Sequence, residues 1–320
     1  MAGGADAGPG GRAVRAVDPA RTERLARVLR GLCRDVRCAE PLRRHTTFRI
    51  GGPADVLVVP RTVDELRAVV TWLYASAEPF VVLGRGSNVL VSDRGVRGVV
   101  VKVGGGLDRV RWDGSRVVAE AGSGLPRLSF RAARRGLSGL EFAAGIPGSV
   151  GGGVVMNAGA HGHSLQEVVR AVRVVGPWGE ATWPAQALEF GYRTSRLQRT
   201  SAVVVEVELE LRPAPVEEVL ERTQRWLQQR GATQPVRLPS SGCIFRNPPG
   251  DAAGRLVELC GAKGMREGGV EVSTLHANYV VNTGGGRAED VLRLVERVRE
   301  RVRRTFGVEL ELEVQLLGEF

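Results

Sequence analysis

The glycine-rich stretch 139–160 constrains the fold of this chain more than any other segment. Seven of its positions are glycine, and no charged residue follows Glu141 within it. Such a run is too irregular for a helix and too poor in side chains to form a core by itself. Glycine allows positive φ angles and close approach of a ligand, and successive amides in such turns can bind an anion. The stretch is therefore either a tight loop between packed elements or a backbone cradle for a phosphate-bearing cofactor.

Length and composition indicate a soluble protein with two or three compact units. The chain has 320 residues, of which 43% are hydrophobic and 25% charged, values typical of globular proteins. No apolar run approaches the roughly 20 residues that span a bilayer. Residues 1–11 lack the apolar region of a secretory signal. We therefore expect a cytoplasmic protein with no membrane partner.

The formal charge of +10 comes almost wholly from arginine. Such a balance favours a polyanionic partner, either nucleic acid or a phosphorylated small molecule. The arginines are scattered and aromatic residues make up only 5% of the chain, which argues against nucleic-acid binding. The four cysteines and four histidines do not have the spacing of a metal site. We expect a small-molecule substrate, no nucleic acid and no metal.

Helix and strand patterns divide the chain. We expect a disordered extension at 1–18, an N-terminal helix within 19–45, a domain at 46–213 and a C-terminal domain at 214–320. The subdomain 46–105 has a β-α-β pattern, with strands at 55–59, 80–83 and 98–103 and a helix opened by a Thr62–Glu65 capping box. In the subdomain 106–213, five short strands indicate a mostly antiparallel sheet.

In the C-terminal domain, the spacing of apolar residues predicts helices at 216–230 and 288–305. Gly231 is expected to end the first of these helices. Strands are expected at 278–281 and 308–316, the second because its polar and apolar residues alternate strictly.

A second glycine turn follows the predicted strand 80–83. It reads Gly84-Arg85-Gly86-Ser87-Asn88. The turn is not GxGxxG, so a Rossmann site fits poorly, but its amides and the Ser87 hydroxyl could bind pyrophosphate oxygens. Two such turns suggest a dinucleotide held between two subdomains.

Four motifs in one order resemble a known enzyme family. They are Thr47-Phe48-Arg49-Ile50-Gly51-Gly52, the turn 84–88, the segment 145–152 and Asn157-Ala158-Gly159-Ala160. This order is similar to that of the UDP-N-acetylenolpyruvoylglucosamine reductases (UDP-N-acetylmuramate dehydrogenases, the MurB family), and the moderate length is similar to the type II branch. The resemblance covers residues 43–320. It implies an α+β fold: a two-subdomain FAD-binding domain of the vanillyl-alcohol-oxidase (PCMH) type plus a C-terminal α+β substrate-binding domain.

The resemblance also implies the cofactors and their ligands. FAD would be bound non-covalently, since the turn 84–88 offers no cysteine or histidine to tether it, and NADPH would be the reductant of a monomeric enzyme. The expected FAD-binding residues are Thr47, Arg49, Gly84, Arg85, Gly86, Ser87, Asn88, Gly145, Ile146, Pro147, Gly148, Ser149, Gly151, Gly152, Asn157, Ala158 and Gly159.

In the family's chemistry, NADPH reduces FAD, and the reduced flavin passes a hydride to the methylene carbon of an enolpyruvyl ether. Negative charge then develops on the substrate carboxylate and C2 before a proton reaches C2. Arg193, in Phe190-Gly191-Tyr192-Arg193-Thr194-Ser195, matches the family's arginine motif. A guanidinium can bind the carboxylate through two hydrogen bonds and stabilise the charge.

Glu313 corresponds to the family's acid. The alternation of residues 308–314 places Glu309, Glu311 and Glu313 on one face of the predicted strand, which by itself indicates only a solvated face. The resemblance assigns a role to Glu313 alone, as the acid that assists the enol intermediate. That role needs a raised pKa, so we expect Glu313 to be buried and the other two to be more exposed.

Cys243 stands where most relatives have a serine as proton donor. The unperturbed pKa of a thiol is about 8.5, well below that of an aliphatic hydroxyl, so Cys243 could supply the proton at least as readily. Two alternatives remain: Cys243 is a small buried apolar residue, or Ser241 is the donor. The resemblance further implies substrate contacts from Tyr192, Arg246 and Asn247.

Two other functions fit parts of the sequence. A different FAD-dependent oxidoreductase of the vanillyl-alcohol-oxidase type would share the fold, but it would not need Arg193, Cys243 and Glu313 together. A basic nucleic-acid-binding protein would explain the charge, but no stacking-aromatic motif or basic helix supports it. We therefore expect an NADPH-dependent flavoenzyme that reduces UDP-N-acetylglucosamine enolpyruvate to UDP-N-acetylmuramate for peptidoglycan synthesis.

Overall fold

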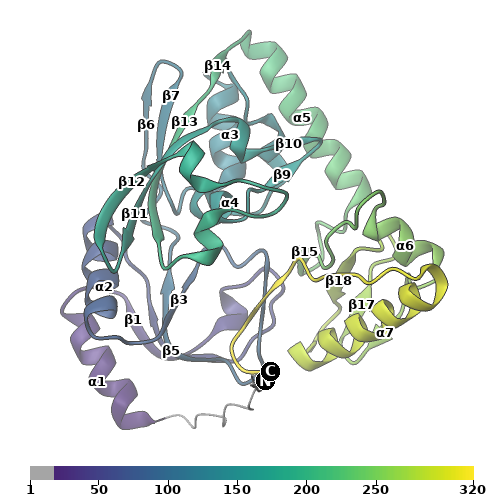
Figure 1. Cartoon of the computed structure of the whole chain (residues 1–320), viewed down its shortest axis with the longest axis horizontal. Coiled ribbons are helices and arrows are strands. Elements are labelled where there is room, and N and C mark those ends of the chain that lie inside the picture. Colours follow the sequence, from purple (N-terminus) through teal and green to yellow (C-terminus); the bar gives the residue numbers. More distant parts are fainter. Residues whose placement is uncertain (1–17) are drawn as a thin grey trace, which may run out of the picture.

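The computed structural model describes residues 18–320, so the predicted disorder of residues 1–18 falls almost wholly outside the described residues. Figure 1 shows two sheet-containing units in the first part of the chain and a third unit formed by the C-terminal part, with the long helix α5 running between them. In the described part of the chain, no helix combines the length and apolar character needed to cross a bilayer.

The first unit is a four-stranded sheet in the order β1-β2-β5-β3. β5 pairs parallel with β2 and β3, and β1 pairs antiparallel with β2, which confirms the predicted β-α-β unit. Its elements are α1 (Pro19–Arg30), β1 (Val36–Pro41), β2 (Pro53–Val58), α2 (Val63–Ala75), β3 (Phe80–Leu83) and β5 (Val96–Lys102). The segment 19–45, expected as an N-terminal helix, therefore contains a helix and an edge strand of this sheet.

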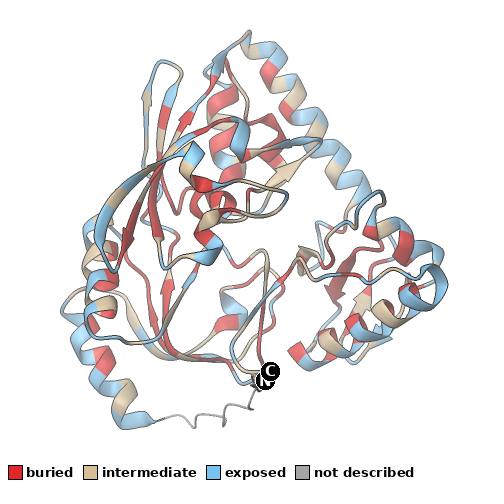
Figure 2. Ribbon diagram, in the orientation of Figure 1, coloured by how far each residue is buried: buried red, intermediate tan, exposed pale blue. Residues whose placement is uncertain are grey.

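The second unit is a five-stranded antiparallel sheet in the order β12-β11-β13-β7-β6, as predicted. Its elements are β6 (Val110–Asp113), β7 (Arg116–Glu120), α3 (Leu125–Ala133), β11 (Val169–Gly176), β12 (Gly179–Pro184) and β13 (Val203–Glu210). Helix α2 of the first unit packs against β11 and β13. Buried residues such as Leu66, Val70 and Val172 therefore belong to one continuous core, visible as red strands in Figure 2.

The glycine-rich stretch contains a helix that the sequence did not predict, α4 (Val150–Val155). The Ser149 hydroxyl caps it by accepting a hydrogen bond from Gly152 N at 3.3 Å. Its glycines permit close packing: an added Cβ at Gly151 would lie 2.8 Å from Ala121 Cβ, and one at Gly153 would lie 2.8 Å from Leu165 Cδ1. Tertiary packing thus overrides the poor helix propensity of glycine.

The C-terminal unit has a sheet in the order β15-β18-β17-β16. Its elements are α5 (Val216–Thr233), β15 (Ser240–Cys243), α6 (Ala253–Leu259), β16 (Arg266–Glu267), β17 (Val270–Val272), β18 (Tyr279–Asn282) and α7 (Ala288–Phe306). Helix α5 does not end at Gly231 as predicted, because one interior glycine costs only about 1 kcal/mol. It packs on α3 and on the 3₁₀ helix η2 (Glu141–Gly145) of the second unit, so the division at residue 214 stays a prediction.

The predicted strand 308–316 is wrong in most of its length. Residues 308–314 belong to no strand ladder and form only one isolated bridge, between Leu312 and Phe245. The strand β19 (Gln315–Leu317) then pairs parallel with β4 (Val89–Val91). The alternation arises because Leu310 and Val314 are buried, not because the segment joins a sheet. The C-terminal tail thus returns to the turn 84–88 (Figure 1).

The remaining short elements connect these parts of the fold. They are β8 (Leu137–Ser138), β9 (Gly159–Ala160), β10 (His163–Ser164), β14 (Arg212–Pro213), η1 (Leu42–Arg44), η3 (Leu165–Glu167), η4 (Ala185–Leu188) and η5 (Arg196–Arg199).

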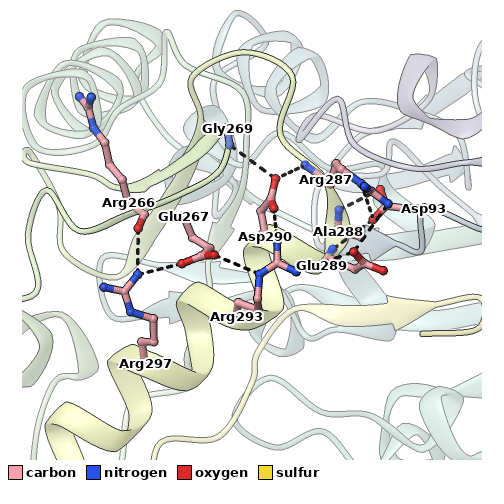
Figure 3. A network of polar contacts seen from close by, with 10 residues as sticks. All are labelled: Asp93, Arg266, Glu267, Gly269, Arg287, Ala288, Glu289, Asp290, Arg293 and Arg297. Carbon is pink, nitrogen blue, oxygen red and sulfur yellow. Dashed lines mark hydrogen bonds and ion pairs between the residues drawn. The ribbon is translucent and has the colours of Figure 1, made fainter.

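A polar network joins the C-terminal unit to the loop after β4 (Figure 3). The Asp93 carboxylate accepts hydrogen bonds from Ala288 N at 3.0 Å and Glu289 N at 3.1 Å, the first two amides of α7. It also pairs with Arg287 at 3.7 Å. A carboxylate at this position satisfies amides that have no partner within the helix and interacts favourably with the helix dipole. One unit therefore caps a helix of the other.

Candidate active site

A cavity of about 870 Å³ lies where the three units meet. It is lined by both glycine turns, through Gly84, Arg85, Gly86, Ser87, Asn88, Gly145, Ile146, Pro147, Gly148, Ser149, Gly151 and Gly152, and also by Ala158 and Gly159. Arg193, Cys243 and Glu313 line the same cavity. The structure therefore brings together three side chains that the sequence carries in widely separated segments.

The two glycine turns lie next to each other in the wall of this cavity. A Cβ added to Gly84 would lie 2.7 Å from Ser149 Oγ, and one added to Gly148 would lie 3.8 Å from Ser87 Oγ. Larger side chains at the glycine positions would fill the space between the turns. The turns thus form a cradle of backbone and short hydroxyl side chains, a lining that fits the pyrophosphate of a dinucleotide such as FAD. Among residues 18–320, no group of three or more His, Cys, Asp and Glu side chains is arranged to hold a metal.

Lys102, at the end of β5, forms hydrogen bonds that hold the glycine turn 84–88 in place. Its Nζ donates hydrogen bonds to Gly84 O at 2.6 Å and to His45 O at 3.1 Å. Burial, with a smaller contribution from the Arg85 charge, lowers the pKa of the Lys102 ammonium to about 8. The sequence analysis did not single out this residue, because a lysine inside a predicted strand carries no motif.

Arg193 has a left-handed backbone, with φ of 55°. Its Nε donates to Glu313 Oε1 at 3.1 Å and its Nη2 to Gly159 O at 2.8 Å. The Asn157 side chain donates to Gly191 O at 2.9 Å, which ties the Arg193 turn to the glycine-rich stretch. The guanidinium is thereby held between the predicted cofactor cradle and the predicted acid.

Glu313 is partly buried and much less exposed than Glu309, in the direction that we expect from the resemblance. Its side chain is 14% exposed, against 73% for Glu309. Burial raises the pKa of the Glu313 carboxyl, and the Arg193 charge offsets only part of that effect. The backbone around it is fixed, because Glu313 N donates to Ile244 O at 2.8 Å and Asn88 Nδ2 donates to Glu313 O at 3.2 Å. The glycine turn therefore positions the acid directly.

Cys243 ends strand β15 and is partly accessible from the cavity. Burial, and then the Glu313 charge, raise the pKa of its thiol to about 12. The pKa therefore lies above the unperturbed value of about 8.5 on which the expectation of ready proton donation rests, and the thiol stays protonated at neutral pH. Ser241, the alternative donor, also lines the cavity, and its buried Oγ has no hydrogen-bond partner among the described residues.

Comparisons with known proteins agree with this site. Residues 54–183 match a family described as FAD binding domain, and residues 234–317 match the family UDP-N-acetylenolpyruvoylglucosamine reductase, C-terminal domain. UDP-N-acetylenolpyruvoylglucosamine reductase 2 of Symbiobacterium thermophilum is 48% identical over 92% of this chain and 97% of its own length. The chain belongs to the UDP-N-acetylenolpyruvoylglucosamine reductase family.

Two further reductases extend this comparison. The reductase of Bacillus subtilis is 43% identical over 87% of this chain and 93% of its own length. The crystal structure of the Thermus caldophilus reductase is 39% identical, covers 88% of this chain and 98% of its own, and superposes with a TM-score of 0.76. The predicted α+β fold with an FAD-binding domain and a C-terminal domain of this reductase family is therefore confirmed.

Three residues expected to bind FAD in this reductase do not line the cavity. Thr47 Oγ1 donates to Ser240 O at 2.7 Å and joins the first unit to strand β15. Arg49 is exposed. Asn157 is buried, and the hydrogen bonds of its side chain go to Gly191 and Gln166. Thr47 and Asn157 thus support the cavity wall instead of forming it.

The three residues expected to bind substrate also lie outside the lining. Tyr192 is 55% exposed, beside the Arg193 guanidinium. Asn247 Oδ1 accepts from Ala253 N at 3.0 Å, at the start of α6. Arg246 is partly buried, its Nε has no partner among the described residues, and its charge lowers the pKa of Glu313 slightly. Tyr192 and Arg246 therefore act on residues of the cavity, Arg193 and Glu313 respectively, and Asn247 does not.

The sequence analysis missed several residues of the cavity wall. Arg230 and Gln234 come from the end of α5, and Tyr279 comes from β18. His161 stacks on Trp226 of α5 with ring centroids 5.0 Å apart. Arg230 and Gln234 lie at the predicted end of a helix, where no motif marks them. Tyr279 ends the segment 273–279, which resembles a family segment that closes over the substrate but assigns no roles to its individual residues. The family resemblance alone did not assign roles to them.

Proposed function

We propose that this reductase acts on UDP-N-acetylglucosamine enolpyruvate through Arg193, Cys243 and Glu313, and that it forms UDP-N-acetylmuramate for peptidoglycan synthesis with NADPH as reductant. FAD, bound non-covalently in the glycine cradle, would supply hydride transfer from NADPH to the substrate. One observation supports the residue roles most strongly: the three side chains line one cavity, and Arg193 bonds to Glu313 there.

Arg193 is suited to bind the substrate carboxylate. Its left-handed turn and its bonds to Gly159 and Glu313 fix the guanidinium in the cavity wall. A fixed cation needs no reorganisation when negative charge develops on the carboxylate, so it stabilises the enol intermediate more than the substrate.

Glu313 and Cys243 are suited to the proton chemistry. Burial raises the pKa of both groups, which favours a protonated carboxyl that can donate a hydrogen bond to the enol intermediate and a protonated thiol that can give its proton to C2. Ser241 remains the alternative donor.

The remaining proposals concern the substrate contacts, the cellular location and the oligomeric state of the enzyme. We assign Arg246 to attract the substrate diphosphate, because its buried Nε has no protein partner among the described residues. Contacts from Tyr192 and Asn247 stay predictions. We also propose that the enzyme is cytoplasmic and that it works as a monomer, since all three reactive residues lie in one chain. Light scattering of the purified protein tests the oligomeric state.

Anaerobic half-reactions test the proposed function. NADPH is expected to bleach the yellow, flavin-loaded enzyme, and UDP-N-acetylglucosamine enolpyruvate is expected to restore the colour with formation of UDP-N-acetylmuramate. Restoration by a simple alcohol-derived carbonyl, but not by the sugar nucleotide, would instead support another flavin oxidoreductase. A colourless protein that takes up no FAD would refute the assignment.

A further inference from the structure

Tyr279 lies directly opposite the proposed proton donor. Strands β15 and β18 are antiparallel, and their register pairs Cys243 with Tyr279, so both side chains project from the same face of the sheet. Both line the cavity. Tyr279 is 5% exposed, and its hydroxyl donates a hydrogen bond to Gln234 Oε1 at 2.6 Å. The phenol is therefore fixed at both ends, by the sheet and by the end of α5.

Four polar groups surround the Cys243 thiol. Glu313 and Arg193 line the same cavity from the tail and from the arginine turn, Arg230 lines it from α5, and Tyr279 faces Cys243 across the strand pair from β18. Arg193 is already bonded to Glu313 and Gly159. A thiol that loses its proton in such a buried place leaves a thiolate that needs a hydrogen-bond donor. Tyr279 is the neutral group able to provide one.

We propose that Tyr279 is a positioning residue for the proton donor: its hydroxyl orients the Cys243 S–H bond toward the cavity and stabilises the thiolate. A hydroxyl has one proton and two lone pairs. It can accept from S–H while donating to Gln234, and it can rotate to donate to sulfur once the S–H bond has broken and the C2–H bond has formed. Water then returns a proton to the thiolate. The inference rests on the proposed function.

The Tyr279→Phe variant, loaded with FAD, tests this role. We expect oxidation of its reduced flavin by the sugar nucleotide to be about tenfold slower, because a hydrogen bond to a charged group is lost. Reduction of its flavin by NADPH should keep the wild-type rate. Alkylation of Cys243 by iodoacetamide at about pH 8, followed on the Cys243 peptide by mass spectrometry, should slow about tenfold, since only the thiolate reacts.

Two further variants separate this role from a merely structural one. In a Cys243→Ala background, Tyr279→Phe should cause no additional loss. Gln234→Leu, which removes the partner of the hydroxyl, should slow the same step less than Tyr279→Phe does. Unchanged alkylation in Tyr279→Phe, or an equal loss in the Cys243→Ala background, would overturn the inference. If the sugar nucleotide does not oxidise the reduced wild-type enzyme, the proposed function is overturned instead. The alkylation rates would still show whether the Tyr279 hydroxyl acts on the Cys243 thiol.

Discussion

Cys243 offers two substitutions that distinguish a proton donor from a packing residue. Cys243→Ser keeps a proton on a side chain of similar size, so we expect most of the turnover to remain. Cys243→Ala removes the proton, and we expect kcat to fall by about a hundredfold or more. Steady-state NADPH oxidation with the sugar nucleotide measures both. Undiminished turnover in Cys243→Ala would instead favour Ser241, whose buried hydroxyl also lines the cavity.

Glu313 should make stability depend on pH in a predictable direction. Burial raises the pKa of its carboxyl in the folded state, so the folded protein binds more protons there than the unfolded chain does. The contribution of Glu313 to the free energy of unfolding is therefore full below the unfolded pKa and is lost as pH rises through the folded pKa. In Glu313→Gln this loss should disappear, and thermal melts of the flavin-free protein across acidic to neutral pH check it. An identical pH dependence in both proteins would contradict the raised pKa.

The residues of the site differ in how well the sequence predicts them. Arg193, Cys243 and Glu313 each belong to a motif and line one cavity, and their catalytic roles stay predictions. Thr47 and Asn157 were assigned to the cofactor because motifs do not distinguish residues that touch a ligand from residues that hold the wall. Tyr279 lies in the segment 273–279, whose resemblance to the family gives it no individual role, because that role depends on its cross-strand partner, which one sequence does not reveal.

Two neighbouring glycines of helix α4 allow the effect of packing on stability to be measured apart from the effect on FAD binding. Both glycines line the cavity, but Gly153 is buried and a Cβ there would lie 2.8 Å from Leu165 Cδ1, whereas Gly152 is exposed and a Cβ there would lie 3.3 Å from Ser149 Oγ. We expect Gly153→Ala to lower the free energy of unfolding of the flavin-free protein by about 1–3 kcal/mol. Gly152→Ala should leave that free energy unchanged or raise it by up to about 1 kcal/mol, but weaken FAD binding. Denaturant titration and flavin retention measure the two effects, and the reverse pattern would contradict this geometry.

The elements that the sequence predicted badly share one cause. Residues 150–155 have poor helix propensity and become helical because Gly151 packs on Ala121. Residues 308–314 alternate like a strand, yet the alternation only buries Leu310 and Val314. In both segments long-range packing decides the local structure. The β-α-β unit and α7 agree with the predictions, because their apolar patterns are long and because the Thr62 cap of α2 is local.

In the whole molecule, the network around Asp93 holds the C-terminal unit against the first unit (Figure 3). That contact matters for catalysis because Cys243 and Glu313 lie in the C-terminal domain and the glycine turn 84–88 lies in the first unit. We expect Asp93→Ala to lower the free energy of unfolding by about 1–2 kcal/mol, as for loss of a helix cap, and to lower kcat several-fold.

Arg297→Ala is the matched control for Asp93→Ala. Arg297 bonds only to Glu267 and Arg266 within the C-terminal unit, and its side chain is 52% exposed. Its loss should cost less than about 0.5 kcal/mol and leave kcat unchanged. Equal effects of the two variants on kcat would mean that the Asp93 contact does not align the units.

The central claim is that Arg193, Cys243 and Glu313 act together on the enolpyruvyl group of the substrate. Stopped-flow measurement of flavin oxidation in single variants tests it most directly. NADPH-reduced Arg193→Met, Cys243→Ala and Glu313→Gln are each mixed anaerobically with UDP-N-acetylglucosamine enolpyruvate. We expect oxidation of the flavin by the sugar nucleotide to slow by about a hundredfold or more in every variant, with reduction by NADPH unchanged. Wild-type oxidation rates in any of the three variants, or losses confined to the NADPH step, would contradict the joint action of these residues on the substrate.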